Sequence, residues 1–300
     1  MSLPLDFVKT KITKKNSLVS VIIPTYNEEK DIGGCLDSLK KQSYSNIEII
    51  IVDDGSVDKT REIVNMFSEK NKKIILINGE HRGPGFSRNL GVKNSHGEIL
   101  VFVDADMVLF EDYVEKLIEP VVQNIALGTI ESIQYNLRNT KMQECWGKEV
   151  RITQIEGVNS STVRAIAKND FLQLGGFDPR YGYADDRTFF LKYGARFLIL
   201  PEVKCYHKTP ETFKGVFKQS RWIGASIDNF FVRNKIIKYF APFFMILLSP
   251  VMIPFLALKK SFLNGEMRLF FPWMLIFMVA RYFGTIGGIS RRIFMNMDYK

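Results

Sequence analysis

Two acidic residues follow an apolar stretch of the type found in buried β-strands. The stretch covers residues 99–103, and Asp104, Ala105 and Asp106 come directly after it. Two carboxylates that follow a strand at this spacing can converge on a hard divalent cation, Mg²⁺ or Mn²⁺, which a diphosphate can share. The same triplet also occurs in solvated turns, so the spacing alone leaves both interpretations open.

A second acidic pair, Asp53 and Asp54, follows another apolar stretch at residues 47–52. An acid at this place can accept hydrogen bonds from a nucleobase N–H or from ribose hydroxyls. The alternative is structural, because Asp54 or Ser56 could cap a helix that begins near residue 58. Both roles stay open at this point.

Short apolar stretches alternate with helical patterns over the first 105 residues. Strands are expected at 18–24, 47–52, 73–77 and 99–103, and helices at 30–42, 58–69 and 84–95. Near-continuous apolar strands separated by helices are typical of a parallel sheet that is covered on both faces. The sequence therefore predicts an α/β fold with a doubly wound, Rossmann-like, mostly parallel sheet. Ligands of such sheets bind beyond the carboxyl ends of the strands, where the polar segments lie.

Positive charge is concentrated in the C-terminal third of the chain. The 300 residues include 41 basic and 32 acidic side chains, a net charge of +9. Residues 213–300 hold 13 of the basic and 3 of the acidic side chains, so residues 1–212 are close to neutral. This distribution argues against a uniformly basic nucleic-acid-binding protein, and no nucleic-acid partner is expected. Basic residues among long apolar runs favour a membrane surface with anionic head groups.

The C-terminal third contains two kinds of apolar segment. Residues 213–237 mix aromatic, aliphatic and basic residues, which is typical of an amphipathic helix in a membrane interface. Residues 239–258 carry no charge over twenty positions, about the length that crosses a bilayer. The alternative for this run is a long helix buried in a protein core.

A second apolar run covers residues 269–290 and is interrupted by Arg281. It could span the membrane with Arg281 facing protein or an interface, or it could be re-entrant. The compact connection at 259–268 favours spanning. Residues 238–300 are therefore expected to form a transmembrane hairpin with a short tail, in a multi-pass protein of the cell membrane with lipid as a partner. Residues 1–17 are expected to form a solvated basic arm.

The polar segments, taken in order, resemble motifs of glycosyltransferase family 2, whose members have the GT-A fold. The matching stretches are 19–28, 51–60, 85–91 and 104–106. The resemblance covers roughly residues 18–225, and the apolar tail resembles that of membrane-bound members. It implies a catalytic domain at 18–212, with a nucleotide-binding half at 18–106 and an acceptor half at 107–212.

The resemblance implies roles on the donor side of the site. Asp53 would contact the nucleobase, Asp104 would hold the ribose or sugar, and Arg88 would reach the nucleotide or sugar. For Arg88 the alternative is a surface ion pair. Three residues of the first motif would line the nucleotide pocket: Pro24, Tyr26 and Glu28.

The resemblance also implies a metal site and a base. Asp106 would bind Mn²⁺ or Mg²⁺ directly, and His207 could complete that site or be structural. Asp185 and Asp186 stand where the family usually has Glu-Asp, after a Gly-Gly-Phe-Asp turn at 175–178. Asp186 would be the catalytic base; the alternative is a pair of acids favoured by a helix N-terminus.

A further motif, at residues 219–222, resembles the Q-x-x-R-W sequence of processive membrane glycosyltransferases. The glutamine lies one position too close, which puts processive synthesis in doubt. Arg221 could still bind diphosphate and Trp222 could stack at the acceptor. The alternative is that both side chains anchor a helix to lipid.

The resemblance implies an inverting transfer of a sugar from a nucleotide-sugar donor, UDP-linked on family frequency. The acceptor would be a hydroxyl on a lipid-linked or cell-surface glycan. Transfer onto polyprenyl or dolichyl phosphate is disfavoured, because Met107 follows the acidic triplet where that group has Leu-Gln. A non-catalytic nucleotide-sugar-binding membrane protein is disfavoured by the presence of Asp106 and Asp186. The catalytic domain is expected to face the cytoplasm, because no signal-like stretch precedes it.

Overall fold

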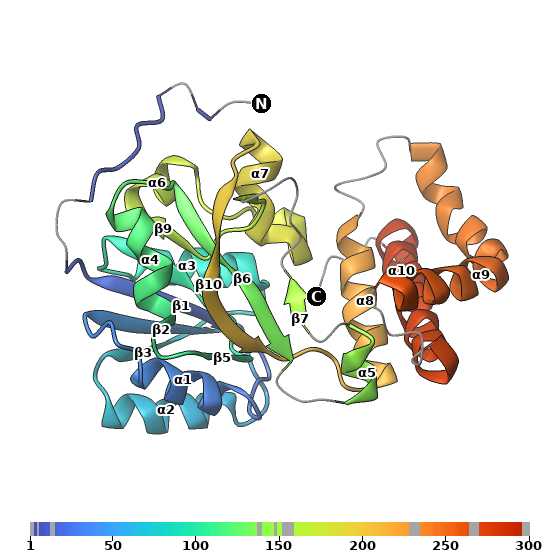
Figure 1. The fold of residues 1–300 in the computed structure, drawn as a ribbon, viewed down its shortest axis with the longest axis horizontal. Coiled ribbons are helices and arrows are strands. Elements are labelled where there is room, and N and C mark those ends of the chain that lie inside the picture. The colour runs from blue at the N-terminus through green and yellow to red at the C-terminus, as the bar shows by residue number, and fades with distance from the viewer. Residues whose placement is uncertain are drawn as a thin grey trace. The chain divides into compact units, whose positions relative to one another are not determined.

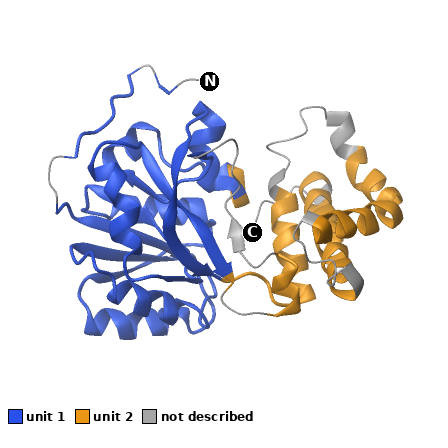
Figure 2. Cartoon of the chain, viewed as in Figure 1, with its two compact units in different colours: residues 1–135, 151–180, 184–207 blue, residues 136–150, 181–183, 208–300 orange. Residues whose placement is uncertain are grey.

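The computed structural model describes residues 3–4, 6–12, 16–136, 140–146, 149–151, 159–227, 235–263 and 270–295. The chain divides into two compact units (Figure 2). The first unit comprises residues 1–135, 151–180 and 184–207, and the second comprises residues 136–150, 181–183 and 208–300. A change of character near residue 212 was expected, but the transfer of 136–150 to the second unit has no signal in the sequence.

The strands and helices have the following bounds. The strands are β1 Val19–Thr25, β2 Ile47–Asp53, β3 Ile74–Asn78, β4 Ile99–Phe102, β5 Met107–Leu109, β6 Gly128–Asn136, β7 Glu149–Arg151, β8 Asn159–Ser160, β9 Ala165–Ala167 and β10 Phe197–His207. The helices are α1 Ile32–Lys40, α2 Thr60–Lys70, α3 Pro84–Lys93, α4 Tyr113–Val122, α5 Lys141–Glu144, α6 Lys168–Gln173, α7 Thr188–Tyr193, α8 Phe213–Ile227, α9 Lys235–Leu263 and α10 Leu275–Met295. Pro179–Arg187 is a 3₁₀ helix (η1), and Phe270–Met274 is a π-helical turn (η3).

The main sheet has the strand order β3-β2-β1-β4-β9-β6-β10-β5 (Figure 1). β1 pairs in parallel with β2 and β4, and β2 pairs in parallel with β3, as expected from the alternating pattern. β9 is antiparallel to both β4 and β6, and β5 is antiparallel to β10. The parallel, doubly wound half is therefore continued by an antiparallel half, and together they form one mixed sheet in an α/β fold.

Alternate side chains of the parallel strands enter two apolar cores. Val21 and Val101 join a core that includes side chains of α1, α2 and α4. Ile22 and Phe102, one residue further along, join a second core that includes side chains of α3, α6 and α7. Because neighbouring strand residues point to opposite faces, near-continuous apolar strands fit a sheet covered on both sides.

The described part of the N-terminal arm lies against the first unit. The Thr10 N–H donates to Asp170 Oδ1 at 2.7 Å, and the Ile12 N–H donates to Asn124 Oδ1 at 3.1 Å. Ile12 is buried in the core on its side of the sheet. The expectation of a solvated arm is therefore wrong for these residues, because backbone donors and one apolar side chain fix the segment.

The second unit contains two helices long and apolar enough to cross a membrane. They are Phe240–Phe262, with a mean hydropathy of 2.1, and Pro272–Ile293, with a mean hydropathy of 1.3. Only 17% of the first apolar window is buried, which argues against a core helix. The connection at 264–269 lies outside the described residues.

Helix α8 packs closely along α10 through glycines. A Cβ on Gly284 would lie 2.6 Å from the Phe217 carbonyl oxygen, and one on Gly288 would overlap the Arg221 carbonyl. These glycines are four residues apart, the spacing that lets membrane helices approach closely. The helix expected at 213–237 is seen as α8, which ends at Ile227; its position in a membrane interface stays a prediction.

Candidate active site

Asp53 ends β2 at the carboxyl edge of the parallel strands, where Thr25 lies opposite it on β1. Asp53 is buried; its Oδ2 accepts a hydrogen bond from the Ser56 N–H at 3.0 Å and lies 3.2 Å from Nε of Arg61. Its Oδ1 is buried too and has no hydrogen-bond partner among the described residues. An unsatisfied buried oxygen costs free energy, so this atom is a candidate acceptor for a ligand N–H.

Asp54 holds the loop that leads into α3. Its carboxylate accepts hydrogen bonds from the backbone N–H groups of Arg82 and Gly83, at 2.9 and 2.8 Å. The Ser87 hydroxyl donates to it at 3.1 Å, and Nδ1 of His81 lies 3.0 Å from Oδ2. With both oxygens engaged, Asp54 has a structural role beside Asp53.

The expectation that Asp54 or Ser56 caps the next helix is wrong. α2 begins at Thr60, whose N–H donates to Asp58 Oδ1 at 3.0 Å. The Ser56 hydroxyl instead accepts from the N–H of Asn27 at 2.8 Å. That contact joins the loops that follow β1 and β2.

The three predicted pocket residues lie at the end of β1 and in the loop after it: Pro24, Tyr26 and Glu28. The partly exposed ring of Tyr26 stacks on His81, with centroids 4.0 Å apart and planes at 22°. The Glu28 N–H donates to Thr60 Oγ1 at 2.8 Å. A stacked ring pair next to this strand edge offers a flat surface that suits a base or sugar.

Arg88 lies on α3 and is buried between two carboxylates. Its Nη1 lies 2.8 Å from Asp185 Oδ1, and its Nη2 lies 2.7 Å from Asp104 Oδ1. Burial opposes the charged form, but Asp185 and Asp104 outweigh it and raise the pKa of Arg88. Its burial excludes the surface ion pair. Contact of Arg88 with a nucleotide or sugar stays a prediction.

Two buried members of this cluster, Arg164 and Glu131, were not identified from the sequence. Arg164 Nη2 lies 2.9 Å from Asp104 Oδ2, and its Nε lies 3.3 Å from Glu131 Oε1. Burial opposes ionisation of Asp104, but Arg164 and Arg88 outweigh it and hold the pKa of Asp104 well below its usual range. Arg164 lies in a region without periodic pattern, so no local signal indicated it.

Asp106 pairs with His207, with Oδ1 and Nε2 3.1 Å apart. His207 Nδ1 lies 3.0 Å from Gln134 Oε1, while Gln134 Nε2 donates to Glu131 at 2.7 Å. Because the Gln134 nitrogen faces a carboxylate, its oxygen faces the imidazole, and Nδ1 carries a proton. Asp104 is paired with Arg88 and Arg164, so Asp106 is the carboxylate that faces His207; convergence of both carboxylates on one cation stays a prediction.

The Asp106 and His207 pair fits a divalent cation. With the proton on Nδ1, Nε2 faces a carboxylate and needs either a second proton or a cation between them. Burial lowers the pKa of His207, but Asp106 outweighs it and raises that pKa. Gln134 orients the ring as an outer-shell partner of a metal ligand does. In the described part of the chain no group of three His, Cys, Asp or Glu side chains could hold a metal ion, so Asp106 and His207 are a pair of candidate ligands and not a complete site.

Asp185 and Asp186 lie in η1, in the last turn before α7. Asp185 Oδ2 is buried with no hydrogen-bond partner among the described side chains and backbone, and a Cβ on Gly85 would lie 2.6 Å from it. Burial raises the pKa of Asp185 to about 7, although Arg88 opposes the shift. Burial also raises the pKa of Asp186. Such shifts bring the pKa of a carboxylate toward the range of a general base. The burial of Asp185 also argues against the alternative that these acids serve only to favour a helix N-terminus.

The Gly-Gly-Phe-Asp turn is tied to α3 by Asn89. Its Nδ2 donates to the Phe177 carbonyl at 2.7 Å, and its Oδ1 accepts from the Phe177 N–H at 3.0 Å. Gly176 has a φ of 70°, and a Cβ there would lie 2.9 Å from Asn89 Oδ1. Only glycine suits that position. α3 therefore positions both Arg88 and the turn that leads to Asp185.

Arg221 and Trp222 lie on α8 in the second unit. The Trp222 ring packs edge-on against Tyr183, with centroids 5.0 Å apart and planes at 88°. The Arg221 backbone packs against Gly288. Their roles toward a diphosphate and an acceptor stay predictions.

Comparison with known proteins gives relatives over part of the chain. Glycosyltransferase GlyA from Streptococcus pneumoniae serotype 4 is 42% identical over 117 residues, 38% of this chain and 17% of that protein. An uncharacterized glycosyltransferase from Haemophilus influenzae is 30% identical over 185 residues, 58% of this chain and 61% of the other. The chain spans less than half the length of the first curated relatives that it matches.

Solved structures share the fold. Staphylococcus aureus TarS 1–349 in complex with UDP-GlcNAc has a TM-score of 0.53 at 18% identity, with 94% of this chain and 93% of that chain covered. Mannosyltransferase PcManGT from Pyrobaculum calidifontis, in complex with GDP-Man and Mn²⁺, has a TM-score of 0.52 at 19% identity, with 94% and 90% covered. The architecture is therefore the expected GT-A fold.

The family model described as glycosyl transferase family 2 matches residues 20–176, more than half of the chain. The matched segment contains Asp53, Arg88, Asp104 and Asp106. This chain belongs to glycosyl transferase family 2.

Proposed function

We propose that this protein is a metal-dependent, inverting glycosyltransferase that uses a nucleotide-sugar donor. One observation carries the proposal: an unsatisfied acceptor on Asp53, the Asp106–His207 pair and the Asp185–Asp186 pair all belong to the first unit. Family membership supports the same activity. Asp53 Oδ1 would accept a hydrogen bond from the nucleobase, and the Tyr26 ring would line the pocket.

The transfer requires stabilisation of the charge on the departing diphosphate and removal of the proton from the acceptor hydroxyl. The charged groups of the first unit suit both requirements. A cation on Asp106 and His207 would supply charge stabilisation for the departing diphosphate. Asp186, whose pKa is raised by burial, would take the proton from an acceptor hydroxyl as that oxygen attacks the anomeric carbon. Attack from the face opposite the leaving group inverts the anomeric centre. Asp185 would keep Arg88 in place beside Asp104.

The donor and acceptor are proposed more narrowly as a UDP-sugar and a hydroxyl on a lipid-linked or cell-surface glycan. The structural neighbours were solved with UDP-GlcNAc in one case and GDP-Man in another, so both nucleotides need testing. Two candidate spans support a membrane location, which would raise the effective concentration of a lipid-borne acceptor. We propose that the first unit faces the cytoplasm.

The test is donor turnover by the purified full chain with Mn²⁺. UDP- and GDP-sugars are supplied with a membrane lipid extract, and nucleotide release and labelled lipid are measured. We expect Asp186→Asn to lower turnover by roughly 100- to 10,000-fold while nucleotide binding persists. Asp112→Asn, which changes a half-exposed acid paired with Lys116, is the matched control.

Two results would count against parts of the proposal. No turnover of any donor by the wild-type protein contradicts the enzyme assignment. Full turnover by Asp186→Asn with transfer onto a lipid phosphate contradicts the hydroxyl acceptor, because an ionised phosphate needs no base.

A further inference from the structure

Two cations of the second unit lie over one pair of aromatic rings. Trp146, just after α5, packs edge-on against Phe277 of α10, with centroids 5.1 Å apart and planes at 84°. Lys260 Nζ lies 5.7 Å and Arg281 Cζ lies 4.6 Å from the Trp146 ring centroid. The same two cations lie 5.0 and 5.7 Å from the Phe277 centroid. Like charges are therefore gathered at one place.

Lys260, Arg281 and the indole N–H of Trp146 have no anionic partner within the described residues. Neither Lys260 nor Arg281 makes an ion pair with a described carboxylate; Glu144, the acid closest in sequence to Trp146, pairs with Lys141 at 2.9 Å. Trp146 Nε1 is buried and, across the described chain, has no hydrogen-bond acceptor. Aromatic rings offset part of the cost of half-burying a cation, but not the repulsion between two cations.

We propose that Lys260, Arg281 and the indole N–H of Trp146 bind a phosphate group supplied by an anionic lipid. A guanidinium offers several N–H donors in a planar fork, an ammonium offers a point charge, and the indole N–H adds a directed hydrogen bond. A phosphate accepts all three and neutralises the repulsion between the cations. The site lies wholly in the second unit and does not depend on the proposed glycosyl transfer.

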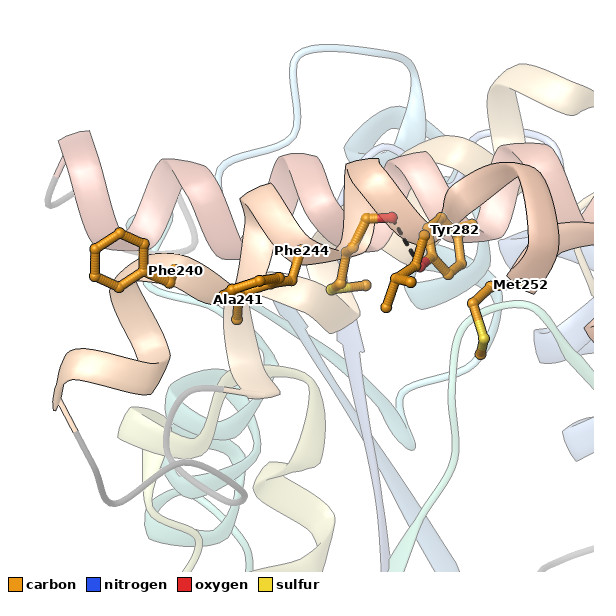
Figure 3. Close-up of a pocket in the computed structure, with 7 residues that line it drawn as sticks. Phe240, Ala241, Phe244, Met252 and Tyr282 are labelled. Carbon is orange, nitrogen blue, oxygen red and sulfur yellow. Dashed lines mark hydrogen bonds between the residues drawn. The ribbon is translucent and has the colours of Figure 1, made fainter.

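The location favours a lipid head group over free phosphate. Lys260 lies near the end of the candidate span Phe240–Phe262, where head groups would meet the hydrocarbon region of a bilayer. Arg281 lies inside the candidate span Pro272–Ile293, a place that a lipid phosphate reaches with its own hydrocarbon chains and that free phosphate would reach only by leaving water. The same two candidate spans carry an apolar groove of about 560 Å³, which Figure 3 shows beside Tyr282. The groove is lined by Phe240, Ala241, Phe244, Met245, Leu248, Met252 and Tyr282. The Tyr282 hydroxyl donates to the Met245 carbonyl, which leaves a lining suited to a hydrocarbon chain.

The test is thermal unfolding of the full chain in a neutral detergent. Dioleoylphosphatidylglycerol, dioleoylphosphatidylcholine and inorganic phosphate are added separately. We expect the anionic lipid to raise the Tm by several degrees and the zwitterionic lipid to leave it unchanged, because only a bound ligand stabilises the folded state. Arg281→Gln and Lys260→Gln should lose the shift. Lys259→Gln, which removes the exposed neighbouring charge, is the matched control and should keep it.

A second readout separates binding from packing. Trp146→Phe keeps an aromatic ring and both cations but removes the N–H, so it should fold and show a smaller lipid shift. Without lipid, Arg281→Gln should unfold at a temperature equal to or above that of the wild type, because it relieves repulsion. An equal lipid shift in Arg281→Gln and the wild type overturns the site. An equal shift from inorganic phosphate alone overturns the lipid source.

Discussion

Buried and half-buried charges are arranged in opposite ways in the two units. In the first unit, Asp104 lies between Arg88 and Arg164, with ion-pair distances of 2.7 and 2.9 Å. In the second unit, Lys260 and Arg281 lie over aromatic rings without a carboxylate partner in the described residues. A paired cluster holds its geometry without a ligand, whereas an unpaired one is completed by a ligand. Removing one charge should therefore destabilise the first unit but not the second.

The largest expected effect comes from breaking the paired cluster with Arg88→Met. The substitution leaves Asp185 buried without a cation and leaves the half-buried Asp104 with Arg164 alone, so the free energy of unfolding should fall by about 3–5 kcal/mol. Urea unfolding of the full chain in detergent measures it. Arg82→Met is the control, because Arg82 is exposed and lies over Phe86; it should cost no more than about 0.5 kcal/mol. Equal losses in the two variants would contradict the paired-cluster account.

A smaller effect is expected from disturbing the glycine contacts between α8 and α10, which stabilise the second unit without ion pairs. Gly284→Ala places a Cβ 2.6 Å from the Phe217 carbonyl oxygen, so separation of α8 and α10 should cost about 1–3 kcal/mol. Gly287→Ala, on the same helix, meets no atom closer than 4.0 Å and should be neutral or stabilising. Thermal unfolding of both variants measures the difference. Equal Tm values would mean that glycine packing does not hold these helices.

The smallest effect concerns Asp185, the acid whose pKa is raised to about 7. A pKa above that of the unfolded chain means that this group favours folding at low pH and that its contribution is lost as the pH rises through about 7. Asp185→Asn imitates the protonated form, so its Tm relative to wild type should increase from pH 5 to pH 8. Asp37→Asn, an exposed acid near Lys40, should show a constant offset. A pH-independent difference for Asp185→Asn would contradict the burial of this charge.

Local patterns were enough to predict the parallel half of the fold. β4 is apolar at every position and β1 at every position except Ser20 and Thr25, and the bounds of both strands were expected within one or two residues. Side chains that follow such strands, Asp53 and Asp106 among them, could be identified because position in the sequence fixes their place at the sheet edge. The antiparallel strands that follow were not predicted over their full lengths, although β6 and β10 are long, because their pairing joins segments that are distant in the sequence.

Partners that are distant in sequence could not be predicted. Arg164, just before β9, pairs with Asp104, just after β4, and Glu131 of β6 pairs with Arg164. The residues next to Arg164 and Glu131 in the sequence do not indicate a charged site. Asp54 looked equivalent to Asp53 in sequence, but the loop before α3 takes both of its oxygens. Such roles depend on tertiary contacts that a motif does not encode.

The central claim is that the first unit binds a nucleotide through a cation on Asp106 and His207. Calorimetric titration of the full chain with UDP and with GDP, each with and without Mn²⁺, tests it most directly. We predict binding that requires Mn²⁺, is lost in Asp106→Asn, is weakened about 10- to 100-fold in Gln134→Leu through the misplaced imidazole, and is unchanged in Asp37→Asn. Nucleotide binding of equal affinity without Mn²⁺, or in all of these variants, would contradict the account.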